Sequence, residues 1–64
     1  MNNYEVFSGN QQSICKAHIQ LITNYKEAER IMLREFKKPE IKEVLIMKNE
    51  EPFEYMSDKG RFRV

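Results

Sequence analysis

The sequence predicts an α+β fold, in which a small antiparallel β-sheet has one α-helix packed on one face. One stretch, residues 24–38, carries apolar residues at helical spacing between two end signals. The segments on both sides of it alternate or are rich in β-branched residues. The 64 residues allow one domain, 1–64. The expected order is therefore β-β-α-β-β, followed at the C-terminus by either a short fifth strand or a frayed end.

The predicted helix, residues 24–38, has a signal at each end. Asn24 followed by Glu27 fits a capping box, in which each side chain satisfies a free backbone amide of the first turn. Lys37 and Lys38 complement the negative end of the helix dipole, and Pro39 forces Lys38 out of helical geometry. The apolar positions, which spread wider than one packing face requires, are Tyr25, Ala28, Ile31, Met32, Leu33 and Phe36.

The segment before the helix allows two interpretations. Residues 4–7 predict a first strand, and the Ser-Gly-Asn cluster after it predicts a turn. Residues 14–22 match a strand better than a helix, and the strand stays the favoured interpretation. As a strand, this segment turns one face to the core, with Cys15, Ala17, Ile19 and Leu21 on it. As a helix, it carries a stripe of Ile14, Ala17, Leu21 and Ile22.

The segment after Pro39 predicts β-structure. Residues 41–47 are rich in branched side chains, residues 48–52 form a polar turn, and residues 53–56 alternate aromatic and polar side chains. Residues 57–60 fit a type I turn with glycine in the last position. The last four residues alternate like an edge strand.

Composition excludes several classes of protein. Cys15 is the single cysteine, so no disulfide can form within the chain, and a lone thiol favours a reducing compartment. The first residues lack a basic and an apolar region, so we expect no secretory signal. The longest apolar run has four residues, far fewer than a membrane span needs. We expect a cytoplasmic globular protein with no membrane contact.

Few residues of this sequence could take part in catalysis or bind a metal ion. Cys15 and His18 are the only soft metal ligands, and a structural zinc site needs four ligands, so we expect none. On a strand the two side chains point to opposite faces, which argues against a Cys–His dyad. Phosphate-binding glycine loops and nucleophile elbows are absent. Glu35 lies on the apolar side of the helix, either reaching past the core to water or pairing with a cation of a partner. We expect no catalysis, cofactor, metal or small-molecule substrate.

A basic helix face, defined by Lys26, Arg30, Arg34 and Lys38, is the clearest charge pattern. These residues recur every fourth position and fall within an arc of roughly 120°, which only Glu27 interrupts. They predict, as the alternative function, a nucleic-acid-binding module that contacts phosphates. A basic and aromatic tail would add Lys59, Arg61, Phe62 and Arg63. The formal net charge of only +1 argues against this alternative.

The apolar run at residues 44–47 predicts a different surface. Four consecutive apolar residues on a strand place apolar side chains on both faces of the sheet, and one helix can cover only one face. Leu45 and Met47 are therefore candidates for contact with a partner, together with the basic helix face. The favoured function is a non-enzymatic interaction protein, such as a regulator, adaptor or inhibitor, that binds another protein or forms a homodimer.

Overall fold

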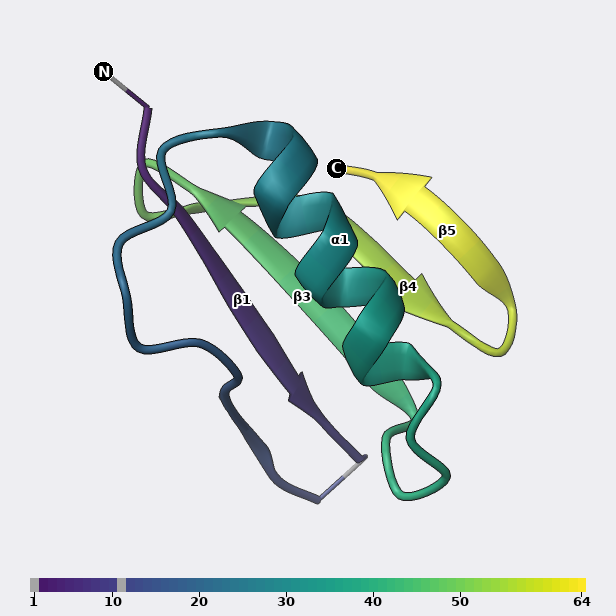
Figure 1. Ribbon diagram of the computed structural model, residues 1–64. Coiled ribbons are helices and arrows are strands. Elements are labelled where there is room, and N and C mark those ends of the chain that lie inside the picture. Colours follow the sequence, from purple (N-terminus) through teal and green to yellow (C-terminus); the bar gives the residue numbers. More distant parts are fainter. Residues whose placement is uncertain (1, 11) are drawn as a thin grey trace.

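The computed structural model describes residues 2–10 and 12–64 and confirms the predicted α+β fold. One helix and a five-stranded antiparallel sheet form in the order β-β-α-β-β-β, so the fifth strand is present. The strands lie side by side in the order β2-β1-β3-β4-β5 (Figure 1). Their bounds are Tyr4–Gly9 (β1), Ile14–Lys16 (β2), Tyr25–Phe36 (α1), Glu43–Lys48 (β3), Glu51–Ser57 (β4) and Gly60–Arg63 (β5).

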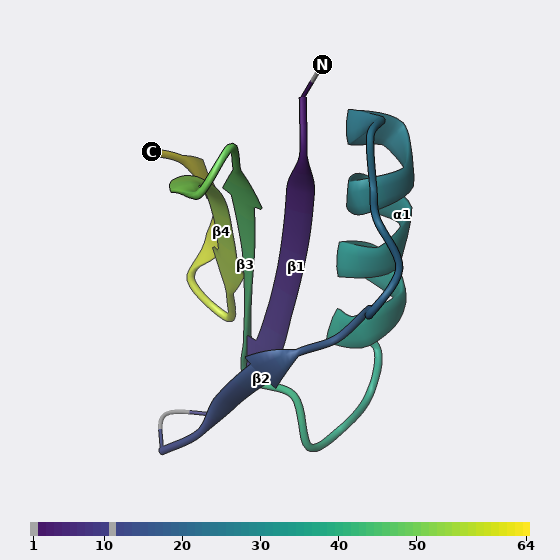
Figure 2. The ribbon, with the colours of Figure 1, turned by 90° about the vertical axis from the view of Figure 1, so that its left-hand side faces the viewer.

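The helix packs on one face of the sheet, against β1 and β3 (Figure 2). In β1 every second side chain points toward α1 and is buried there, and in β3 Val44 and Ile46 are buried in the same way, because successive residues of a strand face opposite sides. Burial of these side chains against the apolar stripe of the helix supplies the main stabilisation. The apolar core consists of Tyr4, Val6, Ile22, Ala28, Ile31, Met32, Val44 and Ile46.

Both ends of α1 have local causes. The Asn24 side chain accepts hydrogen bonds from the backbone N–H groups of Lys26 and Glu27, at 2.7 and 3.3 Å, which confirms the predicted cap. The Glu27 carboxylate does not complete the capping box but binds Arg30 instead. The helix ends at Phe36, before the predicted Lys38. Its last turn is tighter than an α-helical turn, because the backbone hydrogen bonds there join residues three positions apart instead of four.

Replacing the capping side chain should weaken the helix start. We expect Asn24→Ala to lower the free energy of unfolding by about 0.5–2 kcal/mol, since two amide groups lose their acceptor. Urea unfolding followed by circular dichroism measures this change. Asn24→Asp restores the acceptor and is the matched control. Equal losses for both variants would contradict the capping role.

The structure corrects the interpretation of residues 14–22. Only Ile14–Lys16 forms a strand, and neither a longer strand nor a helix occupies this segment. The predicted core face is wrong: Ile19 is 90% exposed and Leu21 is 72% exposed, whereas Ile22 is buried and pairs with Tyr4. The chain leaves the sheet after Lys16 because it must cross to the face that carries α1, so strand alternation stops there.

The lone thiol is exposed, which overturns its predicted place in the core. Cys15 lies on the short edge strand β2, and its nearest polar contact is the Ser13 hydroxyl at 3.9 Å. A thiol reagent should therefore modify Cys15 in the native protein nearly as fast as in urea. A large slowing in the native protein would show that the side chain is shielded.

The β3–β4 hairpin turns more tightly than predicted and carries a bulge. Asn49 and Glu50 both have positive φ, which forms a two-residue turn, so β4 already begins at Glu51. Ile46 pairs with Glu54, and its successor Met47 pairs with Pro52, which leaves Phe53 as the extra residue. The bulge breaks the predicted alternation of β4. Phe53 and its successor both turn toward the helix side, where each contacts Tyr25.

Candidate protein-binding face

The sheet face opposite α1 carries a row of apolar side chains that crosses the strands. Directly paired residues of antiparallel strands point to the same face. Phe7 pairs with Leu45, Leu45 pairs with Tyr55, and Tyr55 pairs with Phe62. The neighbours of Leu45 in β3 are buried under the helix, so this row must lie on the other face.

Met47 lies on the same face as this row, one pair farther along β3. It pairs with Glu5 of β1, and its strand neighbour Ile46 is buried under the helix. Leu45 and Met47, which the apolar run predicted as candidates for contact with a partner, therefore both lie on the face opposite the helix. We use the name outer face for the side chains Phe7, Leu45, Met47, Tyr55 and Phe62.

Within the described ranges 2–10 and 12–64, no element lies over the outer face. α1 and the segment that leads into it both lie on the opposite side of the sheet (Figure 2). Phe62 is 53% exposed, and the other four side chains are partly exposed. A continuous apolar surface of this kind is typical of a contact site.

The polar side chains on this side of the sheet have partners. Lys16 forms an ion pair with Glu5 at 3.2 Å. The Tyr55 hydroxyl donates a hydrogen bond to Glu43 at 3.2 Å. Partial burial raises the pKa of Tyr55, and the nearby Glu43 carboxylate raises it further, so the hydroxyl keeps its proton. The Lys16–Glu5 pair is therefore neutral, whereas Glu43 keeps its negative charge, because the Tyr55 hydroxyl is an uncharged donor.

The basic helix face is much less cationic than its sequence suggests. Each of its four members lies within 4 Å of a helix carboxylate: Lys26 near Glu29, Arg30 near Glu27, and Arg34 and Lys38 near Glu35. Spacings of three residues bring most of these charges together, a signal that was present in the sequence. The hydrogen bond from Arg30 is the chief cause of the lowered pKa of Glu27.

Glu35 is buried, although both sequence-based interpretations placed it near solvent or a partner. Its side chain is 6% exposed and accepts hydrogen bonds from the Ser8 hydroxyl at 3.0 Å and from the Lys38 ammonium at 2.8 Å. Burial alone would raise the pKa of Glu35, but the bonds from Lys38 and Ser8 outweigh it and lower the pKa. The carboxylate thus ties the end of α1 to β1.

This lowered pKa predicts acid sensitivity. Because the carboxyl binds its proton less tightly in the folded state, its stabilisation is present above the ordinary value of 4.5 and is lost as the pH falls below that value. We expect Glu35→Gln to flatten the dependence of unfolding free energy on pH in this window. Urea titrations between about pH 3 and pH 6 measure it. Glu40→Gln, a change at an exposed site of the next loop, is the control.

A second buried carboxylate lies where β4 and β5 meet the helix. Glu54 is 4% exposed, accepts a hydrogen bond from the Tyr25 hydroxyl and binds the Arg61 guanidinium at 2.6 Å. Arg61 also bonds Glu29 of the helix. Arg63 approaches Glu54 at 3.9 Å and stacks on the Tyr25 and Phe53 rings. The tail arginines thus fasten β5 to α1.

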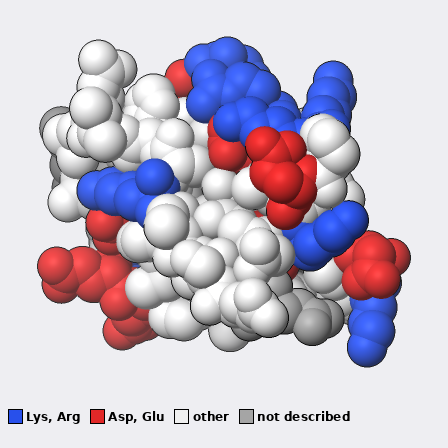
Figure 3. Space-filling model, turned by 90° about the horizontal axis from the view of Figure 1, so that it is seen from below, with Lys and Arg blue, Asp and Glu red and all other residues white. Residues whose placement is uncertain are grey.

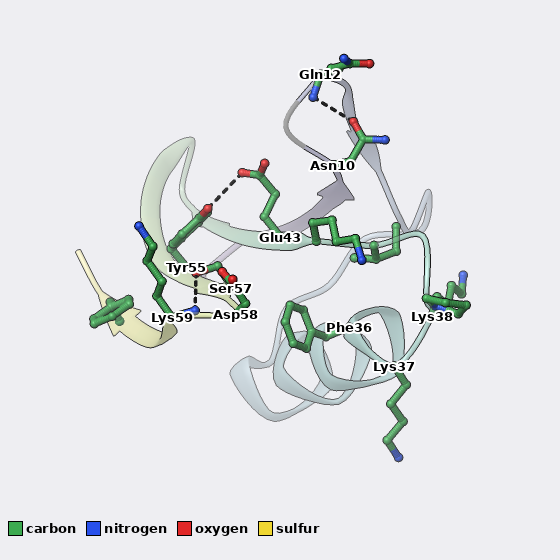
Figure 4. A pocket seen from close by; sticks show the side chains of 14 residues that line it. Asn10, Gln12, Phe36, Lys37, Lys38, Glu43, Tyr55, Ser57, Asp58 and Lys59 are labelled. Carbon is green, nitrogen blue, oxygen red and sulfur yellow. Dashed lines mark hydrogen bonds between the residues drawn. The ribbon is translucent and has the colours of Figure 1, made fainter.

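A wide, open groove lies at the lower end of the molecule, next to the outer face. It encloses about 1080 Å³ between the end of α1 and the β4–β5 turn, and Phe36, Ile41, Tyr55 and Phe62 are among its apolar walls (Figure 4). Lys37 points away from it (Figure 4). Seen from below, an uncharged area is bordered by charges of both signs (Figure 3). Lysines outnumber carboxylates along the groove, whose charged residues are Lys37, Lys38, Lys42, Lys59, Glu43 and Asp58.

Comparison with known proteins does not narrow the function. No protein-family model matches this chain, and no similar curated protein or solved structure was found. The one helix of the described residues is too short and too polar to cross a membrane. Among the same residues, no three His, Cys, Asp or Glu side chains gather as metal ligands would.

Proposed function

We propose that this chain is a non-enzymatic interaction protein, acting as a regulator, adaptor or inhibitor, that binds a protein through its outer face. The observation that carries this proposal is the apolar row of Phe7, Leu45, Tyr55 and Phe62 without a covering element in the described structure. Burial of such side chains contributes about 25 cal/mol per Å² of apolar surface. Aromatic side chains at the centre of a patch are frequent anchors of binding. The lone exposed thiol favours the reducing cytoplasm as the site of action.

A matched pair of lysine substitutions tests this function. Leu45 lies in the centre of the outer face, whereas Leu33 is 39% exposed on α1, on the opposite side of the molecule. We expect Leu45→Lys to abolish capture of the proteins that the native chain retains from a lysate, because a charge would enter the apolar contact. We expect Leu33→Lys to retain them. Circular dichroism checks that both variants fold.

The opposite result has a clear meaning. If Leu45→Lys and the native chain captured the same proteins in the same amounts, the outer face would not be the binding surface. Met47→Lys repeats the test at the neighbouring position on β3. Retention of capture in both variants would overturn the proposed function.

The nucleic-acid alternative stays a prediction. If Lys26, Arg30, Arg34 and Lys38 contacted phosphates of duplex DNA, the logarithm of affinity would fall with the logarithm of salt concentration with a slope of about −3 to −4. The carboxylates beside each of these cations compete with phosphate, so we expect little retardation of DNA even at low salt. A steep salt dependence would favour this alternative.

A further inference from the structure

We infer that the outer face is covered by a second copy of this chain, so that two sheets pack face to face with one helix on each outside. This inference rests on the proposed function, because it names the protein that the outer face binds. The side chains at the contact are Phe7, Leu45, Met47, Tyr55 and Phe62.

The size of the outer face fits a weak dimer of this kind. The five strands contain 26 residues, and each residue occupies about 3.3 Å along its strand and about 4.8 Å across the sheet. One face of the sheet therefore covers about 410 Å² in projection, about 9% of the total surface of 4582 Å². Two such faces together amount to about 820 Å², below the ~1,000 Å² of a stable specific interface, so the dimer that we infer is a weak one.

The charges of the face favour an identical partner over an oppositely charged one. Lys16 and Glu5 neutralise each other at 3.2 Å, and Glu43 accepts a hydrogen bond from Tyr55. An interface with an acidic or basic protein would require an excess of the opposite charge, which this face does not have. Two copies meet with limited repulsion, because Lys16 and Glu5 neutralise each other within each chain, although Glu43 keeps its negative charge.

The small core gives an energetic reason for this arrangement. A chain of 64 residues buries only about 60% of the surface that its unfolded form exposes, so its single core leaves little margin. The fully buried apolar side chains all lie between the sheet and α1. Face-to-face packing adds a second apolar layer, in which two sheets lie about 10 Å apart. Association therefore stabilises the fold of each copy.

The oligomeric state of the complete chain tests the inference. We expect sedimentation equilibrium to give a dimer of the native chain and a monomer of Leu45→Lys, whose dimer dissociation constant should rise about 100-fold or more. Leu33→Lys, on the helix, should remain a dimer. Phe62→Ser removes a half-exposed ring at the end of the row and should weaken the dimer about 10-fold without threatening the fold.

Two results would overturn the inference. The native chain could sediment as a monomer up to about millimolar concentration, where even a weak dimer would form. Alternatively, a dimer could survive both Leu45→Lys and Phe62→Ser, which would place its contact elsewhere, such as at the free edge of β5.

The same variants separate failure of the dimer from failure of the proposed function. A monomeric native chain whose capture of other proteins depends on Leu45 would exclude self-association but support binding at the outer face. A monomeric chain that captures the same proteins with and without Leu45→Lys would exclude both.

Discussion

Arg61→Met should remove a large part of the protein's stability, although the side chain lies on an exposed edge strand. Arg61 binds Glu54 at 2.6 Å and the Tyr25 hydroxyl at 2.9 Å, and it also pairs with Glu29. Hydrogen bonds from its guanidinium to Glu54 and Glu29 raise the pKa of Arg61, so its charge is permanent. Its removal leaves the Glu54 carboxylate, only 6% exposed, without its main counter-charge.

The expected loss is about 3 kcal/mol, the lower end of the range for breaking a buried ion pair, because water reaches a third of Arg61. A 64-residue domain has a total stability of roughly 3–10 kcal/mol, so this variant should be close to unfolding. Urea unfolding at pH 7 measures the loss. Lys26→Met is the control, because Lys26 is 86% exposed and lies 3.9 Å from Glu29.

A double variant distinguishes an orphaned carboxylate from lost packing. Glu54→Leu combined with Arg61→Met removes both charges, and we expect it to recover most of the stability that Arg61→Met loses. If the double variant were as unstable as Arg61→Met, packing of the arginine stem would be the main contribution. If Arg61→Met unfolded like the native chain, the cluster around Glu54 would have no structural role.

Ile31→Ala should destabilise the protein by about 2–5 kcal/mol, the range for truncating a fully buried aliphatic side chain. Ile31 has no exposed surface and packs in the layer between α1 and the sheet. The loss combines the apolar transfer energy with the cavity that remains, and a core this small has few neighbours that can fill it.

Leu33→Ala is the matched control for Ile31→Ala, two residues away on the same helix. Leu33 is 39% exposed, so we expect its truncation to change stability by no more than about 0.5 kcal/mol. Thermal and urea unfolding of both variants measure the difference. Similar losses of stability in the two variants would show that Leu33 is as important to the core as Ile31, which would contradict the buried face of α1 in this structure.

The elements whose signals are local could be predicted from the sequence. The helix start at Asn24, the turn before Gly60 and the strand character of β3, β4 and β5 all follow from neighbouring residues. The apolar run at residues 44–47 indicated apolar side chains on both faces of the sheet, and the structure places Leu45 and Met47 on the face opposite the helix. The pairing of Glu27 with Arg30 could also be predicted from their spacing of three residues. The four basic residues alone suggest a more cationic helix face than the paired charges produce.

Residues 14–22 show where local signals stop being decisive. Their alternation predicts a strand with Ile19 and Leu21 in the core, yet both side chains are exposed. The segment is instead shaped by its ends, because Lys16 pairs in the sheet and Ile22 pairs with Tyr4 on the way to the helix. The distance that this segment must span between the sheet and the helix cannot be predicted from the periodicity of its residues.

The sequence by itself determined the element order, the helix cap and the presence of an apolar surface that one helix cannot cover. Only the tertiary structure decided the strand order, the bulge at Phe53 and the burial of Glu35 and Glu54. The burial of Glu35 and Glu54 depends on partners 27 and 29 positions away, Ser8 and Tyr25. The strand order depends on pairs such as Tyr4 with Lys48, which are farther apart still. Capping and turn formation involve neighbouring residues, whereas register and burial arise from contacts that exist only after the chain has closed on itself.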